Sequence, residues 1–299
     1  MANKLTLAIL GPGGVGGLLA GLLSRAGHHV ICLSGEDTVT HLRTHGMRVR
    51  SARFGDFTVP VAADTELRAP VDAVLITVKH TALDAALDRL PAAALGDALL
   101  VPFLNGVEHP ASLRARYGPE AVAPAVIRVE STRVEAGVIE HASPFAEVDL
   151  TGAQVARVRL DALAEALSEA GPTTRVLPDE TAALWAKMAF LAPFALLTTR
   201  HGLPLGEVRT RHRGDLTALV AEVAAVSGAC GGPADPAAAL ARYDAFPPAT
   251  RSSMQRDAEA GRPLELDAIG GALLRAAERH GVPVPVAARL VRELRDAGY

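Results

Sequence analysis

The sequence predicts two domains of different structural class: an α/β domain over residues 1–178 and an all-α domain over residues 179–299. Three observations support this division. A glycine-rich turn follows the first apolar run of the chain, as in a strand–turn–helix unit. Two later runs, Val71–Val78 and Leu99–Leu104, are almost continuously apolar, which is typical of strands buried on both faces of a parallel sheet. From Pro178 onward, only helical patterns remain.

The glycine turn is the main functional motif of the first domain. A G-x-G-x-x-G spacing at Gly11, Gly13 and Gly16 follows the apolar run Leu5–Leu10 and precedes the helical pattern Leu18–Ala26. The first glycine permits a tight turn, the second lets backbone N–H groups approach a pyrophosphate, and the third lets the helix pack against the strand. We therefore predict a Rossmann-type dinucleotide site here rather than a purely structural turn.

The end of the second predicted strand, Val30–Leu33, bears on the choice of cofactor. A carboxylate at this place favours the ribose hydroxyl of NAD, whereas an arginine favours the 2′-phosphate of NADP. The sequence continues with Ser34, Gly35 and Glu36, and Arg43 lies in the following helix. Glu36 could take the NAD role or begin a helix, so these residues leave the preference open.

The remaining elements follow from apolar periodicity. A hairpin is expected over Met47–Ala52 and Phe57–Val61. Three antiparallel strands are expected to close the sheet, at Ala121–Val129, Val134–His141 and Glu147–Thr151. A helix over Gln154–Ala170 and a short strand over Thr174–Leu177 complete the domain. The helices expected in the second domain are Thr181–Thr199, Asp215–Cys230, Pro236–Asp244, Ala249–Ala260, Leu264–His280 and Val284–Ala297.

Two polar residues follow buried strands directly. Lys79 comes after Val71–Val78, and Asn105 comes after Leu99–Leu104. Since ligands of open α/β sheets bind outside the carboxyl ends of the strands, both side chains are expected to face the ligand. The alternatives are a solvated helix-start lysine and an ordinary Asn-Gly turn.

Lysine is rare in this chain and one lysine has an unusual position. The chain has three lysines, Lys4, Lys79 and Lys187, against twenty-seven arginines. Lys187 lies on a strongly apolar helical pattern, where burial lowers the pKa of a lysine and suits it to donate a proton to a carbonyl oxygen. The alternative is a lysine that extends along its stem to solvent.

Hydroxyls and carboxylates recur near the end of the chain. Ser252 or Ser253 could bind a substrate carboxylate, and Glu265, two residues before Asp267, could pair with Lys187 or hold a substrate hydroxyl. The alternatives are a helix cap for the serines and a solvated helix start for the carboxylates.

These residues together resemble the ketopantoate reductase (2-dehydropantoate 2-reductase) family over nearly the full chain. The matching stretches are Gly11–Gly16, Thr77–His80, Leu104–Val107, Gly137–His141, Trp185–Lys187, Ser252–Met254 and Glu265–Asp267. The resemblance implies a Rossmann domain, an all-helical domain, an active site in the cleft between them, and NADPH-dependent reduction of a 2-oxo acid, 2-dehydropantoate by default.

The resemblance also implies roles for particular residues. Lys187 matches the proton-donating lysine, Glu265 the carboxylate that orients it, and Ser253 a ligand of the substrate carboxylate. Lys79 and Asn105 match residues near the nicotinamide. The cofactor set implied by motif and resemblance is Gly11, Gly13, Gly14, Val15, Gly16, Ser34, Lys79 and Asn105.

The chain departs from the family pattern at three positions. Gly35 replaces the usual arginine, so NADP(H) is favoured by resemblance while NAD(H) remains an alternative. Leu191 and Ala195 replace asparagines that line the substrate site, and each lost hydrogen bond removes about 1–3 kcal/mol of recognition for a polar ligand. Alternatives are therefore a reductase of a less polar ketone or oxo acid, a non-redox cyclase or isomerase, and a cofactor-binding regulatory protein without turnover.

Composition narrows the function classes further. The net charge of −3 and the lack of a basic cluster with aromatic residues argue against a nucleic-acid partner. Cys32 and Cys230 show no metal-ligand spacing, so we expect no metal. The apolar stretch Ala182–Leu197 contains Lys187 and Pro193 and is short, so we expect no membrane segment. The two cysteines also form no disulfide framework, so we expect a cytoplasmic location, and the family resemblance implies a small-molecule substrate. The oligomeric state stays open, a homodimer included.

Overall fold

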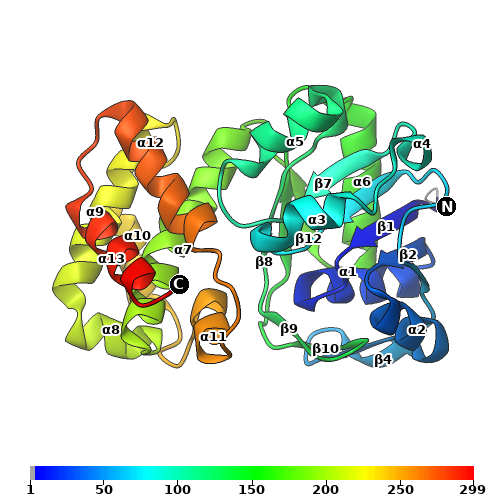
Figure 1. Cartoon of the computed structure of the whole chain (residues 1–299), viewed down its shortest axis with the longest axis horizontal. Helices are drawn as coiled ribbons and strands as arrows, with labels where there is room; N and C mark the ends of the chain where they lie inside the picture. Colours follow the sequence, from blue (N-terminus) through cyan, green and yellow to red (C-terminus); the bar gives the residue numbers. More distant parts are fainter. Residues whose placement is uncertain (1–3) are drawn as a thin grey trace. The chain divides into compact units, whose positions relative to one another are not determined.

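The computed structural model describes residues 4–299, which form two compact units. Unit 1 consists of the residues up to Leu104 together with His109–Glu180, and unit 2 consists of Asn105–Glu108 together with Thr181–Tyr299 (Figure 1). The predicted division at residue 178 lies two residues from the second of these boundaries. No sequence pattern indicates that Asn105–Glu108 groups with the helical unit.

A five-stranded parallel sheet with the order β5-β2-β1-β6-β7 forms the centre of unit 1, which confirms the predicted fold class. Its strands are β1 (Thr6–Leu10), β2 (His29–Leu33), β5 (Ala62–Asp64), β6 (Ala73–Ile76) and β7 (Leu99–Pro102). Side chains alternate between the two faces, because Leu7 and Ile9 belong to one apolar core and Ala8 and Leu10 to another. Both faces are therefore buried, as the apolar runs predict.

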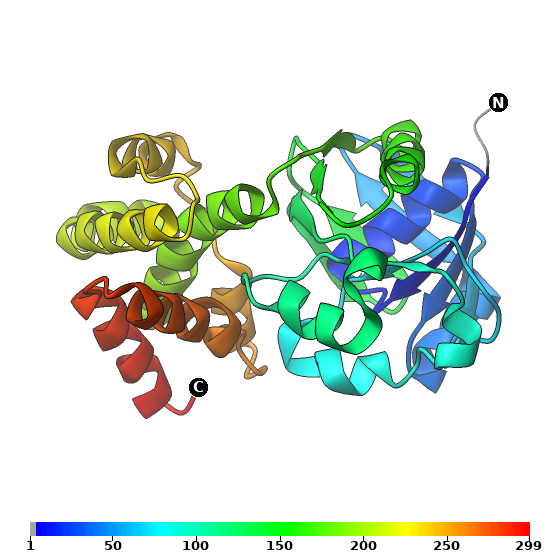
Figure 2. The ribbon, with the colours of Figure 1, turned by 90° about the horizontal axis from the view of Figure 1, so that it is seen from above.

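Helices lie on both sides of this sheet (Figure 2), and they contribute residues to both cores. The core that contains Leu7 includes residues of α1 (Gly14–Arg25), α2 (Glu36–His45) and α6 (Arg157–Ala170). The core that contains Ala8 includes residues of α3 (Leu83–Leu87), α4 (Ala92–Leu95) and α5 (His109–Tyr117). Two 3₁₀ turns, η1 (His80–Ala82) and η2 (Pro119–Ala121), lie in the connections.

The remaining strands of unit 1 form two further ladders. One has the order β4-β3-β10-β9, with β3 (Met47–Ser51), β4 (Gly55–Val59), β9 (Ser131–Glu135) and β10 (Val138–His141). The other has the order β12-β11-β8, with β8 (Ala125–Arg128), β11 (Glu147–Leu150) and β12 (Thr173–Val176). The predicted hairpin is confirmed, since β3 and β4 pair antiparallel with Met47 opposite Val59.

Two predictions for this region were wrong. The late strands do not close the parallel sheet, although β8 lies near its edge through a bridge between Leu100 and Val122. The stretch Val134–His141 is not one strand, because the chain reverses at Gly137, whose φ of +66° suits a glycine in a tight turn. A short alternating pattern cannot by itself distinguish one long strand from two that pair across such a turn.

Unit 2 is entirely helical among its described residues. Its helices are α7 (Glu180–His201), α8 (Leu205–Arg211), α9 (Arg213–Ala229), α10 (Pro236–Ala245), α11 (Ser253–Glu259), the π-helical segment η3 (Asp267–Gly271), α12 (Ala272–His280) and α13 (Pro285–Asp296). The predicted helix from Ala249 was too long, because Ser252 accepts a bond from the Gln255 N–H and so caps α11 at its start.

The central helix of unit 2, α7, is long and apolar enough to span a membrane by composition, with a mean hydropathy of 1.4. However, 56% of that window is buried inside the structure, and Leu196, Leu197 and Met188 are part of the helical core. This burial is typical of the core helix of a folded domain.

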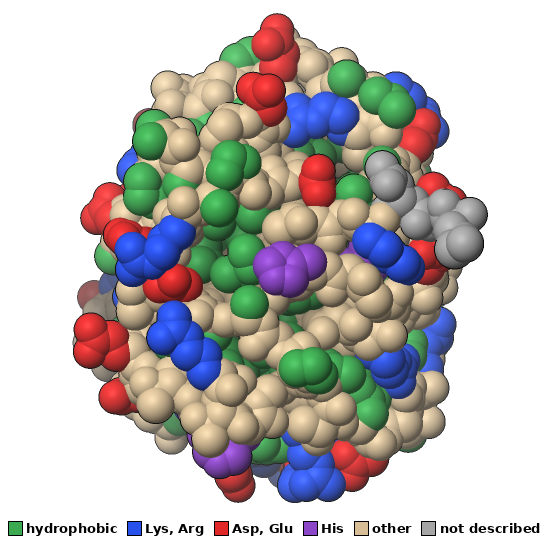
Figure 3. Space-filling model, turned by 90° about the vertical axis from the view of Figure 1, so that its right-hand side faces the viewer, with side chains coloured by type: hydrophobic (Ala, Val, Ile, Leu, Met, Phe, Trp, Pro, Cys, Tyr) green, Lys and Arg blue, Asp and Glu red, His purple; other side chains and the backbone are tan. Residues whose placement is uncertain are grey.

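The face of the molecule in Figure 3 shows how charge is distributed on one side. Lys and Arg side chains alternate there with Asp and Glu side chains, and they do not gather into a basic patch. On this face the structure thus has the mixed surface expected from a net charge of −3.

A buried histidine in unit 1 makes fold stability sensitive to acid. His141 is 4% exposed, and its Nδ1 lies 2.8 Å from Ser51 Oγ. Ser51 Oγ already accepts bonds from the N–H groups of Arg53 and Phe54, so its hydroxyl donates to Nδ1 and requires a neutral ring. Burial lowers the pKa of His141 below its ordinary value of 6.5.

We expect the unfolding midpoint in urea to fall as the pH decreases from about 7.5 to about 5. In the unfolded chain His141 binds a proton at its ordinary pKa, whereas in the folded chain it binds one only at lower pH. The free energy of unfolding is therefore highest above the ordinary pKa and decreases as the pH falls below it. A His141→Gln variant should show a flatter pH profile, and the exposed His29→Gln should retain the parent profile. Equal slopes for all three proteins would contradict this assignment.

Candidate functional site

The glycine turn joins β1 to α1 in unit 1. Gly11 has a φ of +89°, and its carbonyl oxygen accepts a 2.7 Å bond from the Gly13 N–H. Thr77 Oγ1 donates to the same carbonyl at 2.8 Å, so the turn is fixed against the end of β6. The first N–H groups of α1 have no partner within the helix, which makes this end suited to bind an anion.

Packing explains most of the glycines in this turn, but it does not explain Gly13. A Cβ added to Gly11 would lie 2.4 Å from Val78 Cγ1, one at Gly14 would lie 2.2 Å from Ser131 O, and one at Gly16 would lie 2.2 Å from Thr77 Oγ1. A Cβ at Gly13 would meet only Gly11 O, at 4.0 Å. The fold therefore has room for a side chain at Gly13, and close approach of a ligand to the backbone is the remaining reason for glycine there.

A hollow of about 240 Å³ lies beside the turn. It is lined by residues that follow or end β1, β2 and β6 and by the helical segment after them: Leu10, Gly11, Leu33, Ser34, Gly35, Val78, Ala82, Ala85, Ala86 and Arg89. Its place at the carboxyl ends of neighbouring parallel strands is where open α/β sheets bind their ligands. Of the predicted cofactor residues, the structure brings Gly11 and Ser34 together here.

The rim of this hollow lacks a guanidinium at the position that distinguishes the two dinucleotides. Gly35 is the N-cap residue directly before α2, and a Cβ there would meet no atom within 4 Å. Arg89 Nη1 donates to the carbonyls of Ser34 (2.9 Å) and Thr65 (2.6 Å), and Arg43 Nε donates to the carbonyl of Ala63. Both arginines thus already bind backbone within unit 1.

Lys79 and Asn105, which the sequence places at strand ends, belong to different units. Lys79 follows β6 in unit 1, and its side chain is exposed. Asn105 belongs to unit 2, where its Nδ2 donates to Glu265 Oε2 at 2.8 Å. The structure therefore pairs Asn105 with another predicted site residue.

Helix α7 carries Lys187, Leu191 and Ala195 at intervals of four residues, so the three positions share one face of the helix. Lys187 and Leu191 are half-buried, whereas Ala195 is only 1% exposed. An asparagine at position 195 would place an amide in the apolar core, unlike the alanine present.

A tyrosine hydroxyl contacts the backbone of α7 on the turn that contains its internal proline. Pro193 lies inside the helix and has no N–H to donate. The hydroxyl of Tyr243, a fully buried residue, donates to the Phe190 carbonyl and is also hydrogen-bonded to the Phe194 backbone. It therefore bridges the helix one turn after Lys187, a role that no sequence pattern indicates.

The two candidate serines have different environments. Ser252 is 1% exposed, caps α11, and lies 2.8 Å from Thr198 Oγ1 of α7. Ser253 is exposed at the first position of α11. The capping alternative thus applies to Ser252, and Ser253 is the serine whose hydroxyl is accessible to a substrate.

One histidine cluster deserves comparison with a metal site. Ligand atoms of His201, His212 and Asp215 all lie within 4.8 Å of one another. The two imidazole rings stack with centroids 3.6 Å apart and planes 14° apart, so their ring nitrogens do not converge on one point. Asp215 also forms an ion pair with Arg289 at 2.9 Å. The arrangement is better explained as packing of the end of α7 against the junction of α8 and α9.

Comparisons with known proteins agree with this architecture. Residues 7–150 match the family model described as ketopantoate reductase PanE/ApbA, and residues 179–297 match the model of its C-terminal domain. The chain belongs to the ketopantoate reductase family. It is 30% identical to a 2-dehydropantoate 2-reductase of Mycobacterium tuberculosis, with 95% of each chain covered.

Solved structures share the fold of this chain. The crystal structure of 2-dehydropantoate 2-reductase from Methylococcus capsulatus has a TM-score of 0.87 at 27% identity and covers 98% of this chain and 97% of its own. A ternary structure of D-mandelate dehydrogenase with NADH and anilino(oxo)acetate also has a TM-score of 0.87, at 20% identity and 97% coverage of both chains, which shows a shared fold.

As a ketopantoate reductase family member, the chain is an NAD(P)-dependent oxidoreductase that acts on oxo acids. The glycine turn of unit 1 fits the dinucleotide, because Gly13 leaves its backbone open to a pyrophosphate. The site roles of Lys187, Glu265, Asn105 and Ser253 stay predictions, and the structure adds the contact of Tyr243 with the backbone of α7. This contact depends on three-dimensional packing, so no local sequence pattern indicates it.

Proposed function

We propose that this chain reduces a 2-oxo acid to the 2-hydroxy acid, with NADP(H) as the favoured cofactor and 2-dehydropantoate as the first candidate substrate. The observation that carries the proposal is the glycine turn, where Gly13 is the one motif position that packing leaves free for a side chain. Family membership connects that turn to oxo-acid reduction.

The residues of the chain have distinct roles in this reaction. The backbone of the glycine turn and Ser34 would hold the dinucleotide, which would supply the hydride for the carbonyl carbon of the substrate when bound. Lys187 Nζ donates a proton to the carbonyl oxygen, which becomes the new hydroxyl group. Glu265 orients Lys187 and the substrate, and the Asn105 amide fixes one oxygen of the Glu265 carboxylate.

The substrate carboxylate binds the Ser253 hydroxyl in this proposal, with Lys79 and Asn105 near the nicotinamide. Leu191 is half-buried four residues after Lys187, and in this proposal it forms an apolar wall of the site. This observation supports a second candidate, a reductase of an oxo acid or ketone with a less polar side chain, since an apolar wall rejects added hydroxyls only weakly but favours hydrocarbon.

The experiment is a steady-state assay of NADPH and NADH oxidation with 2-dehydropantoate and with 2-oxo acids of increasing apolar side-chain length. Turnover of 2-dehydropantoate with a KM below about 1 mM, an ordinary upper value for a natural substrate, supports the first candidate. Higher kcat/KM with the longer apolar acids supports the second. Oxidation of neither cofactor with any of these acids would refute oxo-acid reduction.

Gly35 provides a test of cofactor preference. We expect Gly35→Arg to tighten NADPH binding by about 10-fold or more relative to NADH, because a charge-assisted bond to the 2′-phosphate contributes about 1.5–3 kcal/mol. The added side chain meets no atom within 4 Å at its Cβ, so the fold should tolerate it. Titration of both cofactors by fluorescence gives the ratio.

Gly35→Gln is the matched control, since it adds length without charge and should leave the ratio near that of the parent. An arginine variant that binds NADPH no better than this glutamine variant would show that position 35 does not contact the 2′-phosphate.

A further inference from the structure

The segment Asn105–Glu108 is held on unit 2 by specific contacts with the region around η3. Its first residue donates from Asn105 Nδ2 to Glu265 Oε2 at 2.8 Å. Its second, Gly106, has a φ of +91°, and a Cβ there would lie 2.5 Å from the carbonyl oxygen of Ala268. The backbone of the segment therefore lies directly on η3, which a side chain at this position would prevent.

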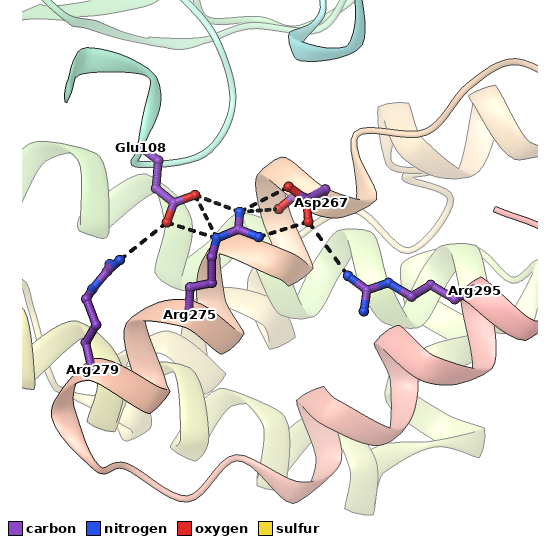
Figure 4. A network of polar contacts seen from close by, with 5 residues as sticks. All are labelled: Glu108, Asp267, Arg275, Arg279 and Arg295. Carbon is purple, nitrogen blue, oxygen red and sulfur yellow. Dashed lines mark hydrogen bonds and ion pairs between the residues drawn. The ribbon is translucent and has the colours of Figure 1, made fainter. Parts of the chain in front are cut away.

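The last residue of the segment, Glu108, is bound by a guanidinium that also holds the start of η3 (Figure 4). Arg275 Nε lies 3.1 Å from both carboxylate oxygens of Glu108, and Nη2 lies 2.7 Å from Oε2. On its other side, Arg275 Nη1 donates to Asp267 Oδ1 at 2.9 Å. Arg279 and Arg295 are more distant members, at 3.6 Å from Glu108 and 3.7 Å from Asp267.

Charge and partial burial strengthen these contacts. The bonds from Arg275 lower the pKa of Glu108, so its carboxylate is ionised at neutral pH. The Glu108 side chain is about one-third exposed, so the pair is less screened by solvent than a fully exposed ion pair. Bidentate arginine–carboxylate contacts also fix direction as well as distance.

The π-helical turn η3 brings Asp267, at its start, close to Arg275. η3 lies between Glu265 and Arg275 in the chain, and Arg275 Nη2 also donates to the Asp267 carbonyl at 3.3 Å. A Cβ at Gly271 would lie 2.2 Å from Asp267 Oδ1 and 3.0 Å from Arg275 Nη1, so glycine is required for this contact. Single π-helical turns are frequent at functional sites because they redirect neighbouring side chains.

We propose that Arg275 is a positioning residue for the reduction: by holding Glu108 and Asp267 at once, it fixes the Asn105 amide against the Glu265 carboxylate. This inference rests on the proposed function, in which Glu265 orients the proton donor. Without the guanidinium, the segment that carries Asn105 loses its attachment at Glu108. The Asn105 amide can then adopt other positions besides the one that binds Glu265.

The kinetic test uses Arg275→Met, Arg275→Lys and the control Arg295→Met, which removes an equal charge from the edge of the same network. We expect Arg275→Met to lower kcat by about 10-fold or more, because small misplacements of catalytic groups cost about that much or more. KM should change less, Arg275→Lys should recover part of kcat, and Arg295→Met should match the parent. The Asn105→Ala, Arg275→Met double variant should be no slower than Asn105→Ala alone.

A second readout does not need turnover. The sequence contains two asparagines, Asn3 and Asn105, so selective ¹⁵N labelling of asparagine side chains gives two NH₂ signals. The Asn105 signal should shift and exchange faster with solvent in Arg275→Met and stay in place in Arg295→Met. Glu108→Gln keeps the shape of the carboxylate and should show the same change if Arg275→Met fails to fold.

Different negative results would contradict the role of Arg275 and the proposed function. An unchanged Asn105 signal in the folded Arg275→Met and Glu108→Gln variants would overturn the inference, as would additive losses of kcat in the double variant. Failure of the parent protein to reduce any oxo acid would refute the proposed function instead, and the Asn105 signals would still report whether Arg275 fixes the amide.

Discussion

Replacing Lys187 with methionine is expected to lower kcat/KM for the oxo acid by about 10²- to 10⁴-fold, the usual contribution of a positioned general acid. Methionine keeps the unbranched stem of lysine on α7 and removes the ammonium group. Lys187 is half-buried, so the exchange should leave the packing of the helix intact. The measurement is steady-state turnover, with thermal unfolding recorded on the same samples.

Two further variants test the proton-donor role of Lys187 more specifically. Lys187→Arg should also be nearly inactive, because a guanidinium does not release its proton near neutral pH. Lys4→Met is the matched control, since the Lys4 ammonium donates to the Ala26 carbonyl in unit 1 and should not affect turnover. A Lys187→Met enzyme that retains more than about a tenth of the parent kcat/KM would rule out the general-acid role.

Replacing Gly13 with valine is expected to weaken cofactor binding strongly without unfolding the protein. The nearest atom beyond adjacent residues is 4.0 Å from the added Cβ, so the Cβ itself makes no close contact in the structure. In the dinucleotide complex the same space is needed by the pyrophosphate, and the resulting steric conflict should raise Kd by about 10- to 100-fold, which corresponds to about 1–3 kcal/mol.

Gly16→Ala separates a structural effect from this binding effect. Its Cβ would lie 2.2 Å from Thr77 Oγ1 and 2.4 Å from Gly11 O, so we expect a lower melting temperature even without cofactor. Calorimetry and cofactor titration of both variants should show opposite patterns. A Gly13→Val protein that binds NADPH and NADH like the parent would exclude the turn as the pyrophosphate site.

The parallel sheet and its glycine turn could be predicted because they depend on local sequence. The apolar runs before Gly11, Lys79 and Asn105 each contain enough consecutive buried side chains to indicate a strand. The reversal at Gly137 was missed because its flanking residues continue one alternating pattern. The π-helical turn at Asp267–Gly271 was missed for a related reason, since one extra residue in a helix barely alters its apolar period.

The sequence predicts candidate site residues, whose roles stay predictions, but it does not predict how they are arranged. Lys187 stands out because lysine is rare, and Glu265 follows from the family motif. The bond between Asn105 and Glu265 joins residues 160 positions apart, and the contact of Tyr243 with the Phe190 carbonyl spans 53. Such pairings depend on tertiary packing, which a single sequence without related sequences does not encode in any local pattern.

The buried position of Trp185 has a practical consequence. It is the sole tryptophan of the chain, lies two residues before Lys187 on α7, and is 4% exposed within the core of unit 2. Indole emission excited selectively over tyrosine therefore originates from one helix, so a change in its intensity or wavelength during titration reports events at the helical unit alone. The native chain thus contains its own optical reporter, and no dye needs to be attached.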